Sequence, residues 1–538
     1  METTTKTKQQ SVLRLLAALF FLCLFAPMAA GQDNWKDHCA TQIANKDGGN
    51  GTSWDNAIVI ATAEELAYFA QQVNNNASIT HKGGASIEPD KDHGFKDYYF
   101  ALSADIDLSD YDWTPIGNAT YPFKGNFDGR GHCVNGLKVM KVETVSGAVY
   151  AGLFGCTSVG ILRNLGVRLA DEGIQANSTG GSAYAGGIAG YAHNIFNCYV
   201  VGEGAIGVSS SEMGDYIYAG GIVGSLGTNS SLANCYATVN VKVESDGRVY
   251  VGGIVGFGNF NSTISHTYAT GDVETGTVDY RRYAGGICGY LQTEGTLTNS
   301  LAVNGRIIGG DSYSNRIIGH QESKATLDAN YASPEIQVNG SVVNDGAGGD
   351  VNGNPSVNLG NFGSVLTWGN GWDTRDDTHL PQLKRQTGDD PNYSYIAWPT
   401  GEGYTPQPSL DAATYFLPKH ILHIVSPTGG TLKVTDKDGN ELSDGSKIVS
   451  GTLLTLSYTE SPNYRFSEYL SGSSADNLRT LSGNTIQISD ADLYLSARFN
   501  YEDPTPPPPP APIYYSVFLP SVEGAVTDPV AGTYDVES

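Results

Sequence analysis

The chain has 538 residues, of which 67 are glycine and 31 are tyrosine, and its formal net charge at pH 7 is −25. This acidic balance argues against a nucleic-acid partner, because a phosphate backbone would be repelled. Glycine at about twice its usual share, combined with many β-forming residues, predicts an all-β protein with many turns.

The first 31 residues have the pattern of a cleaved export signal. Lys6, Lys8 and Arg14 give a basic start, and residues 15–26 form an apolar run that ends in small residues. A run of this length extends about 18 Å as a helix, which is too short for a hydrocarbon core of about 30 Å. We therefore expect residues 1–31 to be removed. The mature protein is then exported, to the cell surface or the extracellular medium, with no transmembrane segment.

Residues 32–97 are expected to form an N-terminal capping region. Thr62 and Glu65 have the spacing of a capping box, in which each side chain satisfies a backbone N–H of the other. The apolar residues that follow fall on one face of an amphipathic helix, namely Leu66, Phe69, Ala70 and Val73. We predict a helix over residues 63–75 that covers the open end of a stack of strands, where core and strand edges would otherwise be exposed.

A repeat dominates the next region, residues 98–384. A motif of the form Tyr-Ala-Gly-Gly-Ile-Val-Gly recurs with its leading tyrosines 34, 34, 32 and 33 residues apart. A unit of about 33 residues cannot bury its own apolar face, but stacked units bury a continuous core. We predict a parallel β-helix, or β-solenoid, with glycine pairs at corners that need a positive φ. The leading tyrosines should lie in register: Tyr150, Tyr184, Tyr218, Tyr250 and Tyr283.

A second motif about ten residues later predicts two further columns of side chains. One column is small and mixed, and it contains Leu165, Cys198 and Cys235. The neighbouring column is mostly aromatic, and because side chains alternate along a strand the two columns point to opposite faces. The pattern does not decide which column faces inward. If the aromatic column faces outward, it is a candidate ligand-contact stripe for sugars or a partner protein, made of Tyr199, Tyr236, Tyr268 and Tyr331.

Six cysteines remain after the signal, and they are widely spaced within apolar runs. No CxxC motif or Cys/His cluster occurs, which argues against a zinc site. Cys198 and Cys235 should be neighbours on adjacent coils. Their Cβ vectors should run parallel and not converge, so we expect both to be reduced.

Few residues suit catalysis. Asp105 and Asp107 share a face of a strand and are candidates for a glycosidase pair or a calcium site, although a structural role in a turn is the favoured interpretation. Asp436–Gly439 resembles a calcium loop over four residues but lacks the distal glutamate, so it fits a hairpin turn. No nucleophile elbow, phosphate-binding loop or zinc-protease motif occurs. We predict no enzyme activity, no catalytic residues, no cofactor and no metal.

The composition changes after residue 384. Residues 385–418 are polar and proline-rich, which predicts a linker. Residues 419–499 alternate like the strands of a small β-rich module. We expect residues 500–512 to form a proline-rich spacer and residues 513–538 to begin a further β module that the chain leaves truncated.

The repeats resemble the GLUG motif, named for a Gly-Leu-any-Gly pattern. Gly152-Leu-Phe-Gly155 matches it literally, and the later repeats carry Gly-Ile-Val-Gly variants. The resemblance extends over residues 50–384 to GLUG-containing surface proteins of the Bacteroidetes, through stretches such as Trp54–Ile60 and Phe123–Gly129. Residues 419–499 resemble the divergent internalin-type B repeat through Pro462–Phe466 and Ala497–Phe499, although Tyr469 stands where that family usually has Trp.

The resemblance implies a surface protein, and the sequence contains no catalytic or metal-binding motif that would point to an enzyme. We therefore expect a non-enzymatic adhesin or ligand-binding protein that recognises a polymeric glycan or a surface protein. A structural stalk is the alternative. A polysaccharide lyase or hydrolase is a third hypothesis, because β-helices host both activities.

Overall fold

The computed structural model describes residues 33–90, 94–143, 147–210, 212, 214–276, 281–310, 313–343, 345–365, 368–373, 378–387, 394–489, 491–503, 514–519 and 532–537. The export signal expected over residues 1–31, and residues 504–512 of the expected spacer, lie outside the described residues. The chain divides into two compact units, Met1–Leu417 and Pro418–Ser538. No helix in the described part of the chain is long and apolar enough to cross a membrane.

The N-terminal region forms the predicted cap. A short 3-10 helix, η1 (Trp35–Asp37), and strand β1 (Ile58–Ile60) precede helix α2 (Ala63–Asn74). The Thr62 side chain accepts a hydrogen bond from the Glu65 backbone N–H, and the Glu65 carboxylate accepts one from Ala61 N (2.8 Å). The apolar face of α2 is buried, and the Phe69 ring centroid lies 4.6 Å from that of Phe100 in the first coil. The helix therefore covers the N-terminal end of the stack, as predicted.

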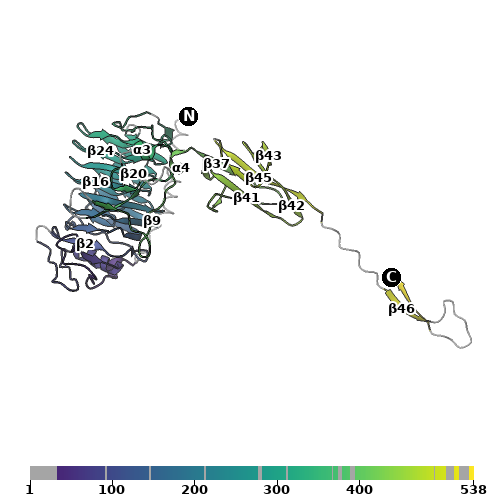
Figure 1. The fold of residues 1–538 in the computed structure, drawn as a ribbon, viewed down its shortest axis with the longest axis horizontal. Coiled ribbons are helices and arrows are strands. Elements are labelled where there is room, and N and C mark those ends of the chain that lie inside the picture. The colour runs from purple at the N-terminus through teal and green to yellow at the C-terminus, as the bar shows by residue number, and fades with distance from the viewer. Residues whose placement is uncertain are drawn as a thin grey trace, which may run out of the picture. The chain divides into compact units, whose positions relative to one another are not determined.

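The first unit is a β-solenoid of about six turns over residues 127–338 (Figure 1). One six-stranded sheet contains β6 (Val149–Ala151), β10 (Ala183–Gly186), β14 (Tyr216–Gly220), β18 (Arg248–Gly252), β22 (Arg282–Gly285) and β27 (Ser314–Asn315). A second contains β7 (Phe154–Cys156), β11 (Ala189–Ala192), β15 (Val223–Leu226), β19 (Val255–Gly258), β23 (Cys288–Leu291) and β28 (Ile318–Gln321). Within both sheets every pairing between neighbouring coils is parallel.

The rest of each coil joins one 20-stranded sheet, whose first strand is β1. It opens with β2 (Tyr99–Leu102), β3 (Ile106–Asp107), β4 (Asn126–Asp128), β5 (Cys133–Glu143), β8 (Ile161–Arg163) and β9 (Gly166–Ser178). The middle coils add β12 (Asn194–Gly202), β13 (Ile206–Ser210), β16 (Ser231–Ala237), β17 (Val241–Ser245), β20 (Thr263–Ala269) and β21 (Val273–Thr275). It ends with β24 (Thr296–Thr298), β25 (Leu301–Ala302), β26 (Arg306–Ile308), β29 (Thr326–Asp328), β30 (Tyr331–Ala332), β31 (Gln337–Val338) and β32 (Ser341–Val342).

The coils stack in the predicted register. Tyr184 pairs with Tyr150 and Tyr218, and Tyr250 pairs with Tyr218 and Tyr283. Cys198 pairs with Cys235, and the structure describes all six cysteines after the signal as free.

The two alternating columns of the second motif separate as expected, and the structure decides their direction. Leu165, Cys198 and Cys235 belong to the solenoid core. Burial raises the pKa of the Cys198 thiol well above its ordinary value. The aromatic column points outward, into a separate cluster of buried residues.

The corners with positive φ are made by asparagine more often than by the glycine pairs. Asn164, Asn197, Asn234 and Asn299 occupy equivalent corners with φ between 49° and 52°. A short polar side chain tolerates this left-handed conformation better than other non-glycine residues do. The glycine pairs serve a different purpose than expected, because most of them have no positive φ. They allow two backbones to approach closely, since a Cβ on Gly221 would lie 2.1 Å from the Gly253 carbonyl oxygen.

The solenoid ends earlier than residue 384. Strand β32 is the last strand of the 20-stranded sheet and pairs antiparallel with β31. From there the sequence is rich in Gly and Asn and has no further copy of the strand motif. The chain then turns back along the coils as what we call the return segment, residues 355–417. Figure 1 shows two of its elements, α3 (Phe362–Val365) and α4 (Ala413–Phe416), beside the stacked strands. Its other elements are β33 (Trp372–Asp373), β34 (Gln382–Leu383), β35 (Arg385–Thr387) and β36 (Ser394–Ile396).

The linker expected over residues 385–418 is therefore wrong for most of that range. Trp398, Ala412 and Phe416 are buried against the solenoid in the same apolar cluster as Tyr199 and Tyr236. The segment looked like a linker because its apolar residues have no period. It needs none, since it packs as an irregular chain whose large side chains join this apolar cluster one at a time.

The second unit contains the expected small β-rich module, built on Leu422, Val434, Leu454, Leu456 and Leu495. A five-stranded sheet contains β37 (Lys419–Ile424), β40 (Lys447–Val449), β42 (Tyr464–Gly472), β43 (Leu478–Leu481) and β45 (Leu493–Tyr501). A four-stranded sheet contains β38 (Gly430–Thr435), β39 (Glu441–Leu442), β41 (Leu453–Glu460) and β44 (Thr485–Gln487). Beyond it, β46 (Tyr514–Leu519) pairs antiparallel with β47 (Gly532–Glu537).

Substitution of Gly224 tests whether the motif glycines are needed for close backbone approach. A Cβ at Gly224 would lie 2.7 Å from each of Ala185 N, Gly190 O and Tyr218 O, all of them backbone atoms. Gly224→Ala should therefore lower the free energy of unfolding by about 1–3 kcal/mol, measured by chemical denaturation. Gly214→Ala is the matched control, because no atom lies within 4 Å of its Cβ position. Equal effects of the two substitutions would contradict this explanation.

Candidate functional site

The aromatic column predicted as a ligand-contact stripe is covered. Tyr199 and Tyr236 are 0% exposed, Tyr268 is 1% exposed, and Tyr331 is half-buried. The rings of Tyr199, Tyr236 and Tyr268 stack on one another, with centroids 5.2 Å apart for Tyr199 and Tyr236 and 4.8 Å apart for Tyr236 and Tyr268. We call these four residues the covered column. Its position outside the solenoid core made it a reasonable candidate, but the return segment closes over it.

Tryptophans of the return segment form the cover. The Trp398 ring centroid lies 5.5 Å from that of Tyr199, and the Trp372 centroid lies 5.5 Å from that of Tyr268. The Tyr268 hydroxyl donates to the Pro381 carbonyl (3.1 Å). The buried Tyr236 hydroxyl has no hydrogen-bond partner among the described residues. This surface is therefore a packed interior and is closed to a ligand.

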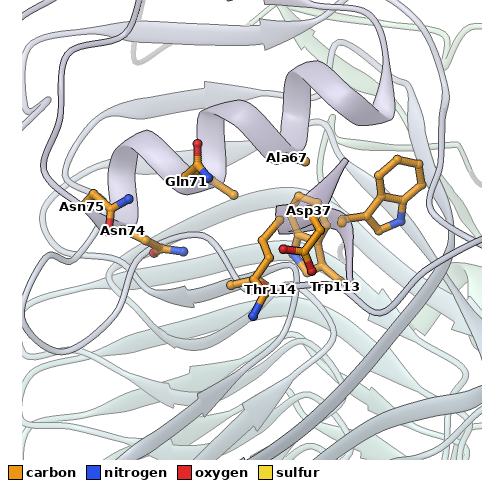
Figure 2. Close-up of a pocket in the computed structure, with 10 residues that line it drawn as sticks. Asp37, Ala67, Gln71, Asn74, Asn75, Trp113 and Thr114 are labelled. Atoms are coloured by element: carbon orange, nitrogen blue, oxygen red, sulfur yellow. The ribbon is translucent and has the colours of Figure 1, made fainter. Parts of the chain in front are cut away.

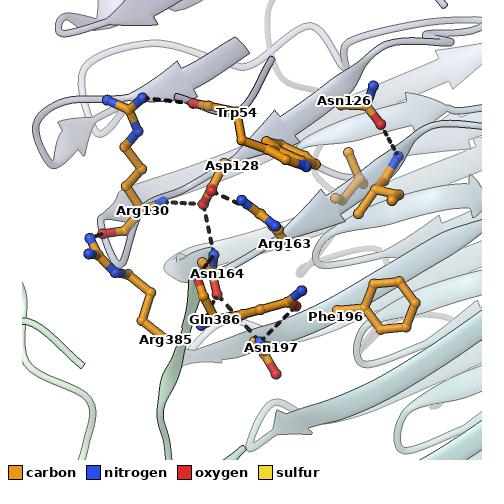
Figure 3. Close-up of polar contacts among 12 residues, drawn as sticks. Trp54, Asn126, Asp128, Arg130, Arg163, Asn164, Phe196, Asn197, Arg385 and Gln386 are labelled. Atoms are coloured by element: carbon orange, nitrogen blue, oxygen red, sulfur yellow. Dashed lines mark hydrogen bonds and ion pairs between the residues drawn. The ribbon is translucent and has the colours of Figure 1, made fainter. Parts of the chain in front are cut away.

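A polar cluster around Asp128 fastens the return segment to the first coils (Figure 3). The Asp128 carboxylate accepts hydrogen bonds from Arg163 Nε (2.9 Å), Asn164 Nδ2 (2.9 Å) and the Arg130 backbone N–H (2.8 Å). Gln386 of β35 donates its backbone N–H to Asn164 Oδ1 (2.9 Å) and accepts from Asn164 Nδ2 at its carbonyl (3.1 Å). The corner asparagines of the coils therefore also bind the return segment.

The same cluster is buried and leaves no position at which a ligand could bind. Arg163 is 4% exposed, and its guanidinium carbon lies 3.7 Å from the centroid of the Trp54 ring, which covers it in Figure 3. Asp128 is 6% exposed and forms an ion pair with Arg163. A buried, hydrogen-bonded pair of this kind is costly to break but holds no open position for a ligand. We assign the cluster a structural role.

The two carboxylates considered for catalysis are used in local structure. Asp107 accepts a hydrogen bond from the Ser109 backbone N–H (3.0 Å). Asp105 lies 3.0 Å from His132 Nδ1 and accepts hydrogen bonds from the backbone N–H groups of Cys133 and Thr405. Burial tends to raise the pKa of Asp105, but these hydrogen bonds outweigh it and hold that pKa below its ordinary value.

The turn that carries Thr405 also places Tyr404 on His132, with ring centroids 4.4 Å apart. Asp105 and His132 therefore form a second attachment point for the return segment. Within the described ranges, no group of three or more His, Cys, Asp or Glu side chains is arranged to hold a metal ion.

A different aromatic column remains partly open to solvent. The leading tyrosines of the repeats, Tyr150, Tyr184, Tyr218, Tyr250 and Tyr283, form what we call the tyrosine ladder. Successive ring centroids lie 4.7, 4.6, 5.3 and 5.1 Å apart, with ring planes within 17° of parallel. At about 4.8 Å per coil the five rings extend about 19 Å along the solenoid.

A second column packs against the ladder edge to face. Phe257 and Tyr290 are stacked on each other at 5.2 Å, and both lie at 75° to 90° to the ladder rings that they contact. Parallel rings this close cover each other's faces, so the ladder presents ring edges and hydroxyls to solvent. Tyr150, Tyr184 and Tyr218 are half-buried, whereas Tyr250 and Tyr283 are only 6% exposed.

The hydroxyls of the three more open tyrosines remain hydrogen-bond donors. Burial raises the pKa values of Tyr150, Tyr184 and Tyr218 above the ordinary value for tyrosine. These phenols therefore keep their protons at neutral and mildly alkaline pH. The ladder offers a row of neutral hydroxyls that repeats once per coil.

The motif itself contained the signal for this surface. A tyrosine leads every well-kept copy of the repeat, two or more positions before the glycines that shape the coil. These tyrosines predict the register of the coils, whereas the predicted ligand-contact stripe comes from the second motif.

One pocket, of about 260 Å³, opens beside α2 (Figure 2). In Figure 2 Gln71 and Asn74 of α2 face Trp113 and Thr114 across it. The Asn74 amide is already used, since its Nδ2 donates to Pro115 O (3.0 Å) and its Oδ1 accepts from Gly117 N (2.8 Å). Trp113 is 2% exposed. Small-molecule sites usually measure about 300–1,000 Å³, and we assign no ligand to this smaller pocket.

The family described as Glug, the GLUG motif, matches residues 215–242. This stretch covers β14, β15 and β16, and it contributes Tyr218 to the tyrosine ladder and Tyr236 to the covered column. No curated protein and no solved structure matches this chain. The protein is a β-solenoid protein that carries a GLUG motif.

Two conservative substitutions test the packing of the covered column. Tyr236→Phe removes a buried hydroxyl that has no described partner, so the free energy of unfolding should stay the same or rise by up to about 1 kcal/mol. Tyr268→Phe removes the hydrogen bond to Pro381 O and should lower it by about 0.5–1.5 kcal/mol. Chemical denaturation of the two variants distinguishes these effects. A larger loss in Tyr236→Phe than in Tyr268→Phe would contradict the description.

Proposed function

We propose that this protein is an exported, non-enzymatic binding protein that recognises an extended polysaccharide through the tyrosine ladder. The observation that carries the proposal is the ladder itself, a row of in-register tyrosines whose edges and hydroxyls are partly open. A surface that repeats about every 4.8 Å suits a ligand that also repeats, such as a polymer lying along the solenoid. Hydroxyls that donate and accept, next to apolar ring edges, suit sugar units.

The export-signal pattern of residues 1–31 supports this proposal, because a protein that binds polysaccharides outside the cell must be exported. We propose a cell-surface or extracellular location for the same reason. The resemblance of residues 419–499 to the internalin-type B repeat belongs to this proposal as well, and it suggests that the second unit serves as a spacer or an additional binding unit. The resemblance to surface proteins of the Bacteroidetes is consistent with such a role.

A structural stalk is the second candidate, and one observation favours it. Tyr250 and Tyr283 are almost closed to solvent, so two of the five ladder residues contribute more to packing than to an accessible surface. In that case the aromatic rings only join the two neighbouring sheets of each coil. The binding protein needs the ladder hydroxyls to bind its ligand, whereas the stalk needs the ladder only for stability.

Removal of three hydroxyls distinguishes these candidates. The triple substitution Tyr150→Phe, Tyr184→Phe and Tyr218→Phe keeps the stacked rings but removes the open hydroxyl row. On an array of polysaccharides the full exported chain should bind at least one polymer saturably, and the triple variant should bind it at least about tenfold more weakly.

Tyr121→Phe is the matched control, because Tyr121 is 41% exposed in the same unit but outside the ladder. This control should bind as the unchanged chain does. If the unchanged chain binds no polymer, or if the triple variant binds equally well, the ladder is not a binding surface and the stalk is favoured.

A further inference from the structure

A third column of outward side chains runs beside the covered column, two residues further along each coil. Arg168 of β9 pairs with Val201 of β12 on the next coil. Thr238 and Thr270 continue the column on the following two coils, each directly after an alanine that pairs between coils. Three of these four side chains are polar, whereas the covered column beside them is aromatic.

The return segment covers only part of this third column. On the last coils, Val303 is buried in the same apolar cluster as the return segment, and the Ser333 hydroxyl donates to the Tyr415 carbonyl (2.8 Å). On the earlier coils a pocket of about 330 Å³ remains between the column and the return-segment residues Pro408, Leu410 and Tyr415. Sites for small molecules usually measure about 300–1,000 Å³, so this pocket has the size of a ligand site.

Arg168 is the cation of the pocket, and no partner from the protein engages it. Its neighbours Val167 and Leu169 belong to the solenoid core, so its own side chain points outward, where it is half-buried. Within the part of the chain that the structure describes, its guanidinium forms no hydrogen bond and no ion pair. Glu172, further along the same strand, lies 3.9 Å from Lys138 instead.

The charge of Arg168 is also not neutralised by the phenols beside it. Burial raises the pKa values of Tyr199 and Tyr236 well above the ordinary value, although the positive charge of Arg168 opposes that rise. Both phenols therefore stay neutral at physiological pH. A charged group that leaves water loses free energy unless a partner compensates it. Acidic residues outnumber basic ones by 56 to 31 in this chain, yet none of those described pairs with this arginine.

The other polar groups of the pocket suit hydroxyls. The Thr238 hydroxyl forms no hydrogen bond within the described ranges. Asn240 accepts a hydrogen bond at Oδ1 from the Asp272 backbone N–H (2.8 Å), which leaves the N–H donors of its amide for a ligand. Glu203 lines the same pocket, is exposed, and forms no ion pair with Arg168. The pocket thus combines one cation with separate donors and acceptors.

We propose that this pocket binds a sugar acid, a ligand of monosaccharide size with one carboxylate and several hydroxyls, either free or at the end of a longer chain. The carboxylate pairs with Arg168, because a planar guanidinium matches it with two parallel hydrogen bonds. Sugar hydroxyls both donate and accept, so they fit Thr238, Asn240 and Glu203. The pocket lies on the 20-stranded sheet and the tyrosine ladder on another, so this inference does not rest on the proposed function.

Pairs of sugars that differ mainly in one carboxylate test this inference. Glucuronate, galacturonate and mannuronate correspond to neutral glucose, galactose and mannose. In titration calorimetry the full chain should bind at least one acid saturably, and at least about tenfold more tightly than either its neutral counterpart or acetate. An oligosaccharide that ends in the same acid then separates the two sources. Tighter binding of the oligosaccharide identifies a chain end as the ligand, and equal or weaker binding identifies the free sugar acid.

Two substitutions in the pocket and one outside it complete the test. Arg168→Gln should remove the preference for the acid without changing the free energy of unfolding, because the arginine side chain has no partner to lose. Thr238→Val keeps the shape of the side chain and should weaken binding about threefold or more. Lys82→Gln is the control, since Lys82 is an exposed cation in the capping region and should not affect binding.

Several results would overturn the sugar-acid site. These are no saturable binding of any acid, equal binding of an acid and its neutral counterpart, and binding of acetate as tight as that of the best acid. Acid binding that survives Arg168→Gln, or a clear loss of stability in that variant, would also overturn it. None of these results bears on the tyrosine ladder, which the triple tyrosine variant tests separately.

Discussion

In-register parallel stacking is the constraint on which the rest of this structure depends. Because each coil pairs with the next through backbone hydrogen bonds, the neighbours of a side chain are its own equivalents one coil above and below. A residue type that recurs in the motif therefore becomes a continuous column. Glycine makes a column of close backbone contacts, asparagine a column of left-handed corners, and tyrosine a column of stacked rings. Each column has a physical property that no single repeat has.

Two tyrosine columns of the same chemical kind have different environments. The return segment covers one with tryptophan rings, and the anchors at Asp128 and Asp105 hold that cover at the first coils. The other column, the tyrosine ladder, packs against further aromatic rings on the same side of the solenoid and keeps part of its edge open. The same repeat thus supplies one tyrosine column that is buried and one that is partly exposed. What distinguishes them is the path of a segment that is not part of the repeat.

Much of the fold was predictable, because periodic features report on stacking. The capping box at Thr62 and the spacing of the leading tyrosines predicted the helix and the register. The direction of the covered column was not predictable, since both alternating columns contain residues that pack well. The return segment was missed because its tryptophans follow no period and its partners lie far away in sequence. The role of the motif glycines was misjudged, because close approach of two backbones leaves the same sequence pattern as a left-handed turn.

Hydroxyl-radical footprinting of the full exported chain tests the central claim most directly, since it reports which tyrosines a bound polymer covers. With a polysaccharide that the chain binds on the array present, we expect new protection at Tyr150, Tyr184 and Tyr218. Tyr236 should be protected both with and without the polymer, because the return segment already covers it. Tyr458 of the second unit, which is 42% exposed, should stay reactive in both states. Saturable binding without new protection along the ladder would contradict the claim that this column is the binding surface.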